Sequence, residues 1–314
     1  MRRNLTLVAG LALAVPVLTA VAPAQAQVQA ARGQSQVTAN TCYVQSGGLT
    51  AGKDTVDRYV NATSPISVKP VETMAQKPFG DRAVSLSSEW VWDDDFGDQT
   101  SLTGNIVSGG VLYDVGVWTQ KGTGGKVVSS DLTRIGGGWD AFRTLTTSWN
   151  IDAGSKWRKY ALRNDGVLFR WNVTADAKGN QVWHAAGSYP GFSAVKAVAL
   201  LSRTSTYDTL LATTRGGALY TIHIPLSSPM KPVVKQVRSS TWQGFETLLT
   251  ARCGNYGTLL LGIDKDTGAG YLYAVGHANG TATVIKGLGK APATFGDPVN
   301  FSWASVVDPP LFGE

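Results

Sequence analysis

The chain has 314 residues, of which 16% are charged, 36 are glycine and 10 are tryptophan. Frequent glycine and few charges are typical of an all-β protein with many tight turns, and about 290 residues can bury a large core. The formal net charge of +6 becomes +4 without Arg2 and Arg3. The sequence contains no run of Lys and Arg with interleaved aromatic residues, which argues against nucleic acid as a partner.

The N-terminus predicts a secretory signal peptide over residues 1–26 and hence a secreted protein. Two arginines precede the apolar run LTLVAGLALAVPVLTAVA, and the small-x-small sequence AQA ends at Ala26. That run contains Pro16, and no later segment approaches the roughly 20 apolar residues of a membrane span. Residues 27–40 are rich in Gln, Ala and polar residues and are expected to be a flexible leader. Residues 41–314 then form a single domain.

The chain has two cysteines, Cys42 and Cys253. An oxidising compartment favours pairing, and a long loop gains the most from closure. We therefore predict one disulfide that joins the N-terminal segment to the last third of the chain. Two free thiols are the alternative.

Two motifs recur along the chain. The first has a glycine, an apolar pair and an aromatic residue: GVLYDV from Gly110, GVLFRW from Gly166, GALYTI from Gly217 and GYLYAV from Gly270. The second has an aromatic residue shortly before a phenylalanine: GWDAF at Trp139, SYPGF at Tyr189 and TWQGF at Trp242, with weaker echoes around Trp92 and Phe295. These five aromatic anchors, about 50 residues apart, predict five repeated units.

Each unit is expected to contain four short strands. Turn residues such as RNDG and TRGG precede the first motif, and small, apolar and aromatic residues then alternate. After Phe295 the chain ends without another Gly-x-Leu-Tyr strand, and the segment TVDRYV from Thr55 can supply the missing strand. The fold class predicted is therefore all-β: a five-bladed β-propeller of four-stranded antiparallel blades, closed by an N-terminal strand. A solenoid, which leaves open ends, is the less favoured solution.

With these motifs in place, the chain resembles the tachylectin family of five-bladed β-propeller lectins. The stretch LTRIGGGWDAFRTL from Leu132 is similar to the core of that family's repeat, and GVLYDV and GVLFRW are similar to its Gly-x-Leu-Tyr strand. The resemblance covers roughly Trp90 to Phe301 and suggests a secreted bacterial member. It implies non-enzymatic binding of glycans, with N-acetylated hexosamines as the ligand class and several sites that give multivalent binding.

The resemblance also implies sugar sites between neighbouring blades, around the Gly-Trp-Asp segment. The ligand-binding residues predicted on this basis are Gly138, Trp139, Asp140, Tyr189 and Trp242. The alternative for the aromatic residues is purely structural, with Trp139 and Phe142 packed between blades and the preceding glycines allowing a tight turn. Both interpretations can apply to one residue.

The motifs of common enzymes are missing from the sequence, which has no His-x-x-x-His pair, no Gly-x-Ser-x-Gly turn and no phosphate-binding glycine loop. No cofactor is expected, apart from a weak calcium hypothesis at Asp93 and Asp95 within WDDDFGDQ. The segment DKDTGAG, with Asp264 and Asp266, occupies a hairpin position and is interpreted as a turn.

Two alternative functions stay open. The first is a polysaccharide hydrolase or lyase on the same scaffold, with Asp93, Asp94, Asp95 and Asp98 converging on a central channel. The second is an exported protein-interaction module without sugar sites. The sequence does not set the oligomeric state.

Overall fold

The computed structural model describes residues 42–150, 156–306, 308 and 310–314. The predicted signal peptide (1–26) and leader (27–40) lie outside these residues. Over the described residues the chain is all-β, and its only helical element is a single 3₁₀ turn, η1 (Trp139–Ala141). None of these residues belongs to a helix long and apolar enough to cross a membrane.

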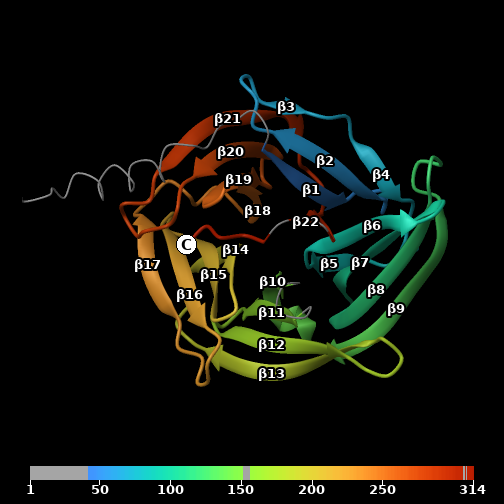
Figure 1. The fold of residues 1–314 in the computed structure, drawn as a ribbon, viewed down its shortest axis with the longest axis horizontal. Helices are drawn as coiled ribbons and strands as arrows, with labels where there is room; N and C mark the ends of the chain where they lie inside the picture. Colours follow the sequence, from blue (N-terminus) through green and yellow to red (C-terminus); the bar gives the residue numbers. More distant parts are fainter. Residues whose placement is uncertain (1–41, 151–155, 307, 309) are drawn as a thin grey trace, which may run out of the picture. The chain divides into compact units, whose positions relative to one another are not determined.

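Three sheets have four antiparallel strands each, and each sheet is a meander in chain order (Figure 1). The first contains β10 (Phe142–Asn150), β11 (Lys156–Arg163), β12 (Leu168–Ala175) and β13 (Gln181–Tyr189). The second contains β14 (Val195–Arg203), β15 (Tyr207–Thr214), β16 (Leu219–Pro225) and β17 (Val233–Arg238). The third contains β18 (Thr247–Cys253), β19 (Gly257–Asp264), β20 (Ala269–Val275) and β21 (Ile285–Thr294). These sheets have the form of propeller-like blades.

A fourth, ten-stranded sheet consists of two antiparallel groups. One group combines N-terminal strands with the C-terminal strand, and we call it the mixed group. It contains β1 (Tyr43–Leu49), β2 (Thr55–Asn61), β3 (Ser67–Val68), β4 (Glu72–Ala75) and β22 (Val299–Ser305). The β5–β9 group contains β5 (Val84–Ser87), β6 (Trp90–Phe96), β7 (Gln99–Ser108), β8 (Val111–Gln120) and β9 (Val127–Gly137). The two groups are joined into one sheet by a short parallel strand pairing, from Trp303 opposite Trp90 to Ser305 opposite Trp92. Each group therefore resembles one of the four-stranded sheets.

The innermost strand of every group, which is β22 in the mixed group, faces a common centre. In the described part of the chain, β5 contacts β10, β10 contacts β14, β14 contacts β18, β18 contacts β22, and β22 contacts β5. The strand groups follow one another around this centre in chain order (Figure 1).

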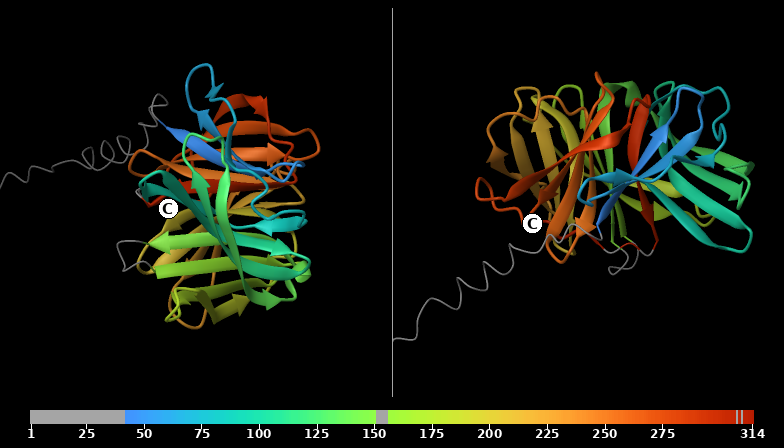
Figure 2. Two further views of the ribbon diagram at one scale, coloured as in Figure 1. Left: turned by 90° about the vertical axis from the view of Figure 1, so that its right-hand side faces the viewer. Right: turned by 90° about the horizontal axis from the view of Figure 1, so that it is seen from above.

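The two ends of the described chain share the mixed group. The C-terminal strand β22 pairs antiparallel with β1, with Ser302 opposite Ser46 and Val299 opposite Leu49. Figure 2 shows the blue N-terminal strands beside the orange and red C-terminal strands. The mixed group therefore joins N-terminal strands to one C-terminal strand. Counted outward from β22, the segment TVDRYV forms the third strand, β2.

The predicted disulfide is present between Cys42 and Cys253, whose Cα atoms lie 5.4 Å apart. It links the residue before β1 to the last residue of β18. Strand pairing and the covalent bond thus both connect the N-terminal strands to the C-terminal part of the chain.

Each boundary between neighbouring groups has its own hydrophobic core. Leu112 of β8, for example, packs in one cluster with Leu145 of β10 and Ala161 of β11. Four further clusters occupy the other boundaries between consecutive groups of described strands. Both faces of a blade are therefore buried, which explains why strands such as β15 and β19 are buried along almost their whole length.

A repeated hydrogen bond explains the glycine that precedes the third strand, and in the last unit this glycine is Gly268, two residues before the motif glycine Gly270. The backbone N–H groups of four aromatic residues donate to glycine carbonyls at 2.8–3.0 Å: Trp139 to Gly110, Phe192 to Gly166, Trp242 to Gly217 and Phe295 to Gly268. All four glycines have positive φ, from 65° to 89°. A Cβ at Gly166 would collide with the backbone of Ser193, so the repeat requires glycine at this position.

This bond also corrects the alignment of the third unit. The sequence motif placed Tyr189 at the position of Trp139, but Phe192 makes the equivalent hydrogen bond and is 6% exposed. Tyr189 ends β13 and is 39% exposed.

Candidate functional site

The predicted Gly138–Trp139–Asp140 segment lies at a blade boundary, but its tryptophan is a core residue. Gly138 adopts a left-handed conformation with φ 82° and precedes η1. The Trp139 ring is 6% exposed and packs against Phe142, Trp171 and Trp183 at centroid distances of 4.6, 5.7 and 5.8 Å. Trp139 is therefore a packing residue between blades, as the structural interpretation expects, and the sugar-binding interpretation of this segment stays a prediction.

The other predicted ligand-binding residues do not form one site with Trp139. Trp242 is 5% exposed and packs on Phe245 and Tyr273, in the cluster between the β14–β17 and β18–β21 sheets. Asp140 is exposed at the surface, where its carboxylate lies over Gly110. Asp140 and Tyr189 are thus accessible but lie on different blades, whereas Trp242 serves in packing like Trp139.

The acidic clusters act mainly as turn residues. Asp93 accepts a hydrogen bond from the backbone N–H of Asp95 at 3.0 Å, and Asp264 accepts bonds from the N–H groups of Asp266 and Thr267. The described residues contain no group of three or more His, Cys, Asp or Glu side chains that could hold a metal ion.

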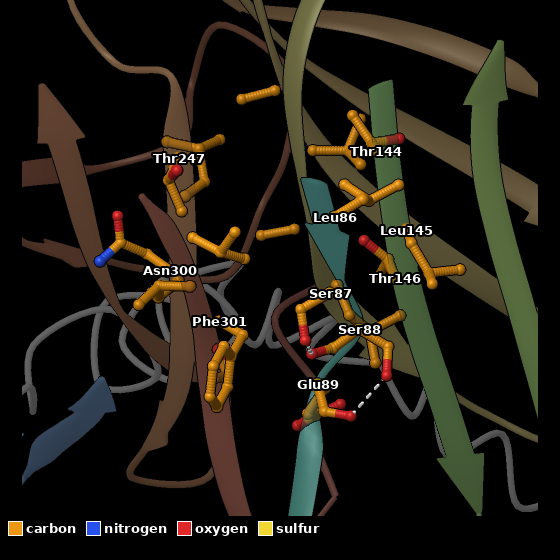
Figure 3. A pocket seen from close by; sticks show the side chains of 18 of the residues that line it. Leu86, Ser87, Ser88, Glu89, Thr144, Leu145, Thr146, Thr247, Asn300 and Phe301 are labelled. Atoms are coloured by element: carbon orange, nitrogen blue, oxygen red, sulfur yellow. Dashed lines mark hydrogen bonds between the residues drawn. The ribbon is translucent and has the colours of Figure 1, made fainter. Parts of the chain in front are cut away.

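A cavity of about 180 Å³ occupies the centre between the first strands of the groups. Figure 3 shows side chains from β5, β10, β18 and β22 around it, including Leu86, Thr144, Thr247 and Asn300. The residues Asp93, Asp94, Asp95 and Asp98 do not line this cavity. The structure does not bring these acids to the central cavity, as the hydrolase alternative requires, because Asp93, Asp94 and Asp95 lie in the second half of β6 and Asp98 lies in the β6–β7 turn.

The acidic side chains that do line this central cavity are Glu89, between β5 and β6, and Glu246. Burial raises the pKa of Glu89 to about 7, while Arg203 and Lys159 act in the opposite direction. Glu246 forms an ion pair with Lys196. Glu89 escaped the sequence analysis because it occurs singly, outside any acidic cluster.

A second cavity, of about 250 Å³, lies between the mixed group and the β5–β9 group. We call it the inter-blade cavity. Its lining residues combine two aromatic rings with carboxyl, amide and hydroxyl groups and with glycine backbone: Gln45, Asp57, Tyr59, Glu72, Thr73, Met74, Trp92, Asp94, Thr100, Thr119, Gln120, Lys121, Gly122, Gly124 and Gly125. This combination suits a small polar ligand with an apolar face.

Asp57 on β2 is the most buried ionisable group of this cavity, at 2% exposed. Its Oδ2 accepts a hydrogen bond from Gln45 Nε2 at 2.5 Å. The indole Nε1 of Trp92 donates to Gln45 Oε1 at 3.4 Å, which orients the amide. Burial raises the pKa of Asp57 from 3.8 to about 7, and the charge of Glu72 acts in the same direction. The strand TVDRYV gave no sign of this role, because its alternation predicts only an exposed Asp.

Replacing Asp57 with Asn is expected to stabilise the protein at pH 8 and to change little at pH 4. The folded-state pKa lies above the unfolded value, so between about pH 4 and pH 7 only the unfolded state ionises, and the wild type loses stability as the pH rises. At about 1.4 kcal/mol per pKa unit the full effect approaches 4 kcal/mol, of which Asn should recover about 2. Urea unfolding of both proteins at the two pH values measures this. An equal difference at pH 4 and pH 8 would contradict it.

The described residues thus define a class of protein: an all-β chain of propeller-like blades with a polar cavity between two of them. No protein-family model matches the chain, and no curated protein gives a significant match. Among solved structures, the chain is similar to the BP39L lectin from Burkholderia pseudomallei, with a TM-score of 0.38 and 15% sequence identity. The alignment covers 78% of this chain and 69% of that one.

Proposed function

We propose that this protein is a secreted, non-enzymatic five-bladed β-propeller that binds glycans. Five blades are supported by the cycle of contacts among β5, β10, β14, β18 and β22 and by a separate core at each boundary. The disulfide between Cys42 and Cys253 is compatible with export. The resemblance of the repeat to the tachylectin family favours hexosamines, which that family binds in N-acetylated form.

The inter-blade cavity is the observation that carries the proposal. Sugars present an apolar face and a ring of hydroxyl groups, so their sites pair an aromatic ring with fixed donors and acceptors. Trp92 and Tyr59 supply the rings, and Asp57, Asp94 and Gln45 supply polar groups within one cavity. Asp140 and Tyr189 stay in the proposal as exposed contacts on other blades, where further weak sites would add avidity.

A glycan array with residues 27–314 tests this function. We expect binding to sugars that weakens at least tenfold in Trp92→Ala or Tyr59→Leu, since either change removes an aromatic surface of the cavity. Trp118→Ala is the matched control, because Trp118 is also half-buried on the β5–β9 group but lies outside the cavity lining. Circular dichroism verifies that each variant is folded. A folded wild type that binds no glycan would refute the proposal.

A further inference from the structure

The carboxyl groups of the inter-blade cavity are not balanced by the basic residue that lines it. Asp57, Glu72 and Asp94 contribute acidic side chains, and Lys121 contributes a cation. The Lys121 ammonium is already committed, since it donates to the backbone carbonyls of Asp94 and Gly97 at 2.5 and 2.9 Å. The lining therefore contains three carboxyl groups and one ammonium group.

One oxygen of this lining is buried without a hydrogen-bond partner. Asp57 Oδ2 is bound by Gln45, but Asp57 Oδ1 has no partner although it is inaccessible to solvent. An unpaired buried carboxylate oxygen is costly, so the charged form of Asp57 gains from a positive charge brought close to it.

A second acid lies directly opposite Asp57. In the antiparallel β2–β4 pair, Asp57 on β2 is in register with Glu72 on β4. Like charges directly opposite across two strands destabilise a sheet, and a cation held between them removes the repulsion. Glu72 is exposed, so a ligand can reach the pair from the cavity mouth.

We propose that the inter-blade cavity binds a hexosamine with a free, protonated amino group, in contrast to an N-acetylated sugar. The inference rests on the proposed function and specifies its ligand. The ammonium group would donate to the exposed Glu72 carboxylate and lie beside the Asp57 carboxyl group, and the sugar ring would lie against Trp92 and Tyr59. Asp94, Gly122, Gly124 and Gly125 border the same space.

The aromatic lining favours an organic cation over a metal ion. Calcium takes six to eight oxygen ligands, whereas Trp92 and Tyr59 offer ring faces, to which ammonium groups are attracted. The raised pKa of Asp57 fits a carboxyl that ionises fully when a cation arrives.

Isothermal titration of residues 27–314 at pH 7 with glucosamine, N-acetylglucosamine and glucose tests the inference. We expect glucosamine to bind at least tenfold more tightly than the two neutral sugars. Asp57→Asn should abolish most of this preference and Glu72→Gln should reduce it. Asp131→Asn is the matched control, because Asp131 is an exposed carboxyl on β9 outside the cavity lining, and it should preserve the preference.

The outcomes separate the inference from the function on which it rests. Binding of N-acetylglucosamine as tight as that of glucosamine, or a preference that survives in Asp57→Asn, overturns the inference while glycan binding stands. Failure of the folded wild type to bind any of the sugars or any glycan on the array overturns both. A parallel titration with calcium chloride adds one arm: calcium binding that Asp57→Asn abolishes, without glucosamine binding, assigns the cavity to a metal and overturns the inference.

Discussion

Replacing Cys42 and Cys253 with alanine is expected to lower the free energy of unfolding by up to about 5 kcal/mol. The disulfide closes a loop with a sequence separation of 211 residues, and the chain entropy removed from the unfolded state grows with loop length. Cys253 also lies in the core between the mixed group and the β18–β21 sheet, so the change leaves a small void there. Urea unfolding of the two proteins under oxidising conditions measures the loss.

Reduction provides the control for this prediction. Wild-type protein in dithiothreitol should lose most of the same stability, whereas the double alanine variant should not respond to the reductant. A loss below about 1 kcal/mol in both experiments would mean that strand pairing between β1 and β22 alone holds the chain ends together.

Replacing Asp208 with alanine is expected to cost about 4 kcal/mol of stability. Asp208 on β15 is fully buried and accepts hydrogen bonds from Arg158, Ser148 and Tyr160 of the neighbouring sheet at 2.5–2.8 Å. Removal of the carboxylate leaves the Arg158 guanidinium buried without its counter-ion, and breaking such a pair costs 3–5 kcal/mol. Thermal and urea unfolding measure the effect.

An exposed ion pair is the matched control. Asp81 lies 3.4 Å from Lys53 Nζ, and its side chain is almost completely exposed, so Asp81→Ala should change stability by less than about 1 kcal/mol. A double Arg158→Met, Asp208→Leu variant should regain part of the loss, since it leaves no charge unpaired. Comparable effects of Asp208→Ala and Asp81→Ala would contradict the assignment of Asp208 as the centre of the buried network.

The repeated motifs allowed the positions of the strands to be predicted from the sequence, because the turn before the third strand depends on a few adjacent residues. A glycine with positive φ before the third strand and an aromatic residue near the next blade leave a clear mark in sequence, as at Gly217 and Trp242. In the stretch SYPGF two aromatic residues lie three positions apart, and sequence spacing alone favoured Tyr189. Only the hydrogen bond to Gly166 identifies Phe192 as the anchor.

The inter-blade cavity could not be predicted in this way. Asp57 lies in a strand that the sequence identifies only as a closing strand, and its burial depends on β4 and β6, whose places beside β2 have no recognisable sequence motif. The clustered acids from Asp93 onwards form a recognisable sequence motif, but they lie at the β6–β7 hairpin, away from the central cavity that Glu89 lines. Three-dimensional proximity of single residues has no local signature.

The sharing of one sheet between β1 and β22 affects how the chain can be made. Val299, the partner of Leu49, follows it by 250 residues, so a growing polypeptide must carry β1 with an open edge until nearly the whole sequence has emerged. Pairings this distant are slow to form. Assembly would therefore finish only after nearly the whole chain has been translated, and fragments that stop before β22 should aggregate through the unpaired edge of β1.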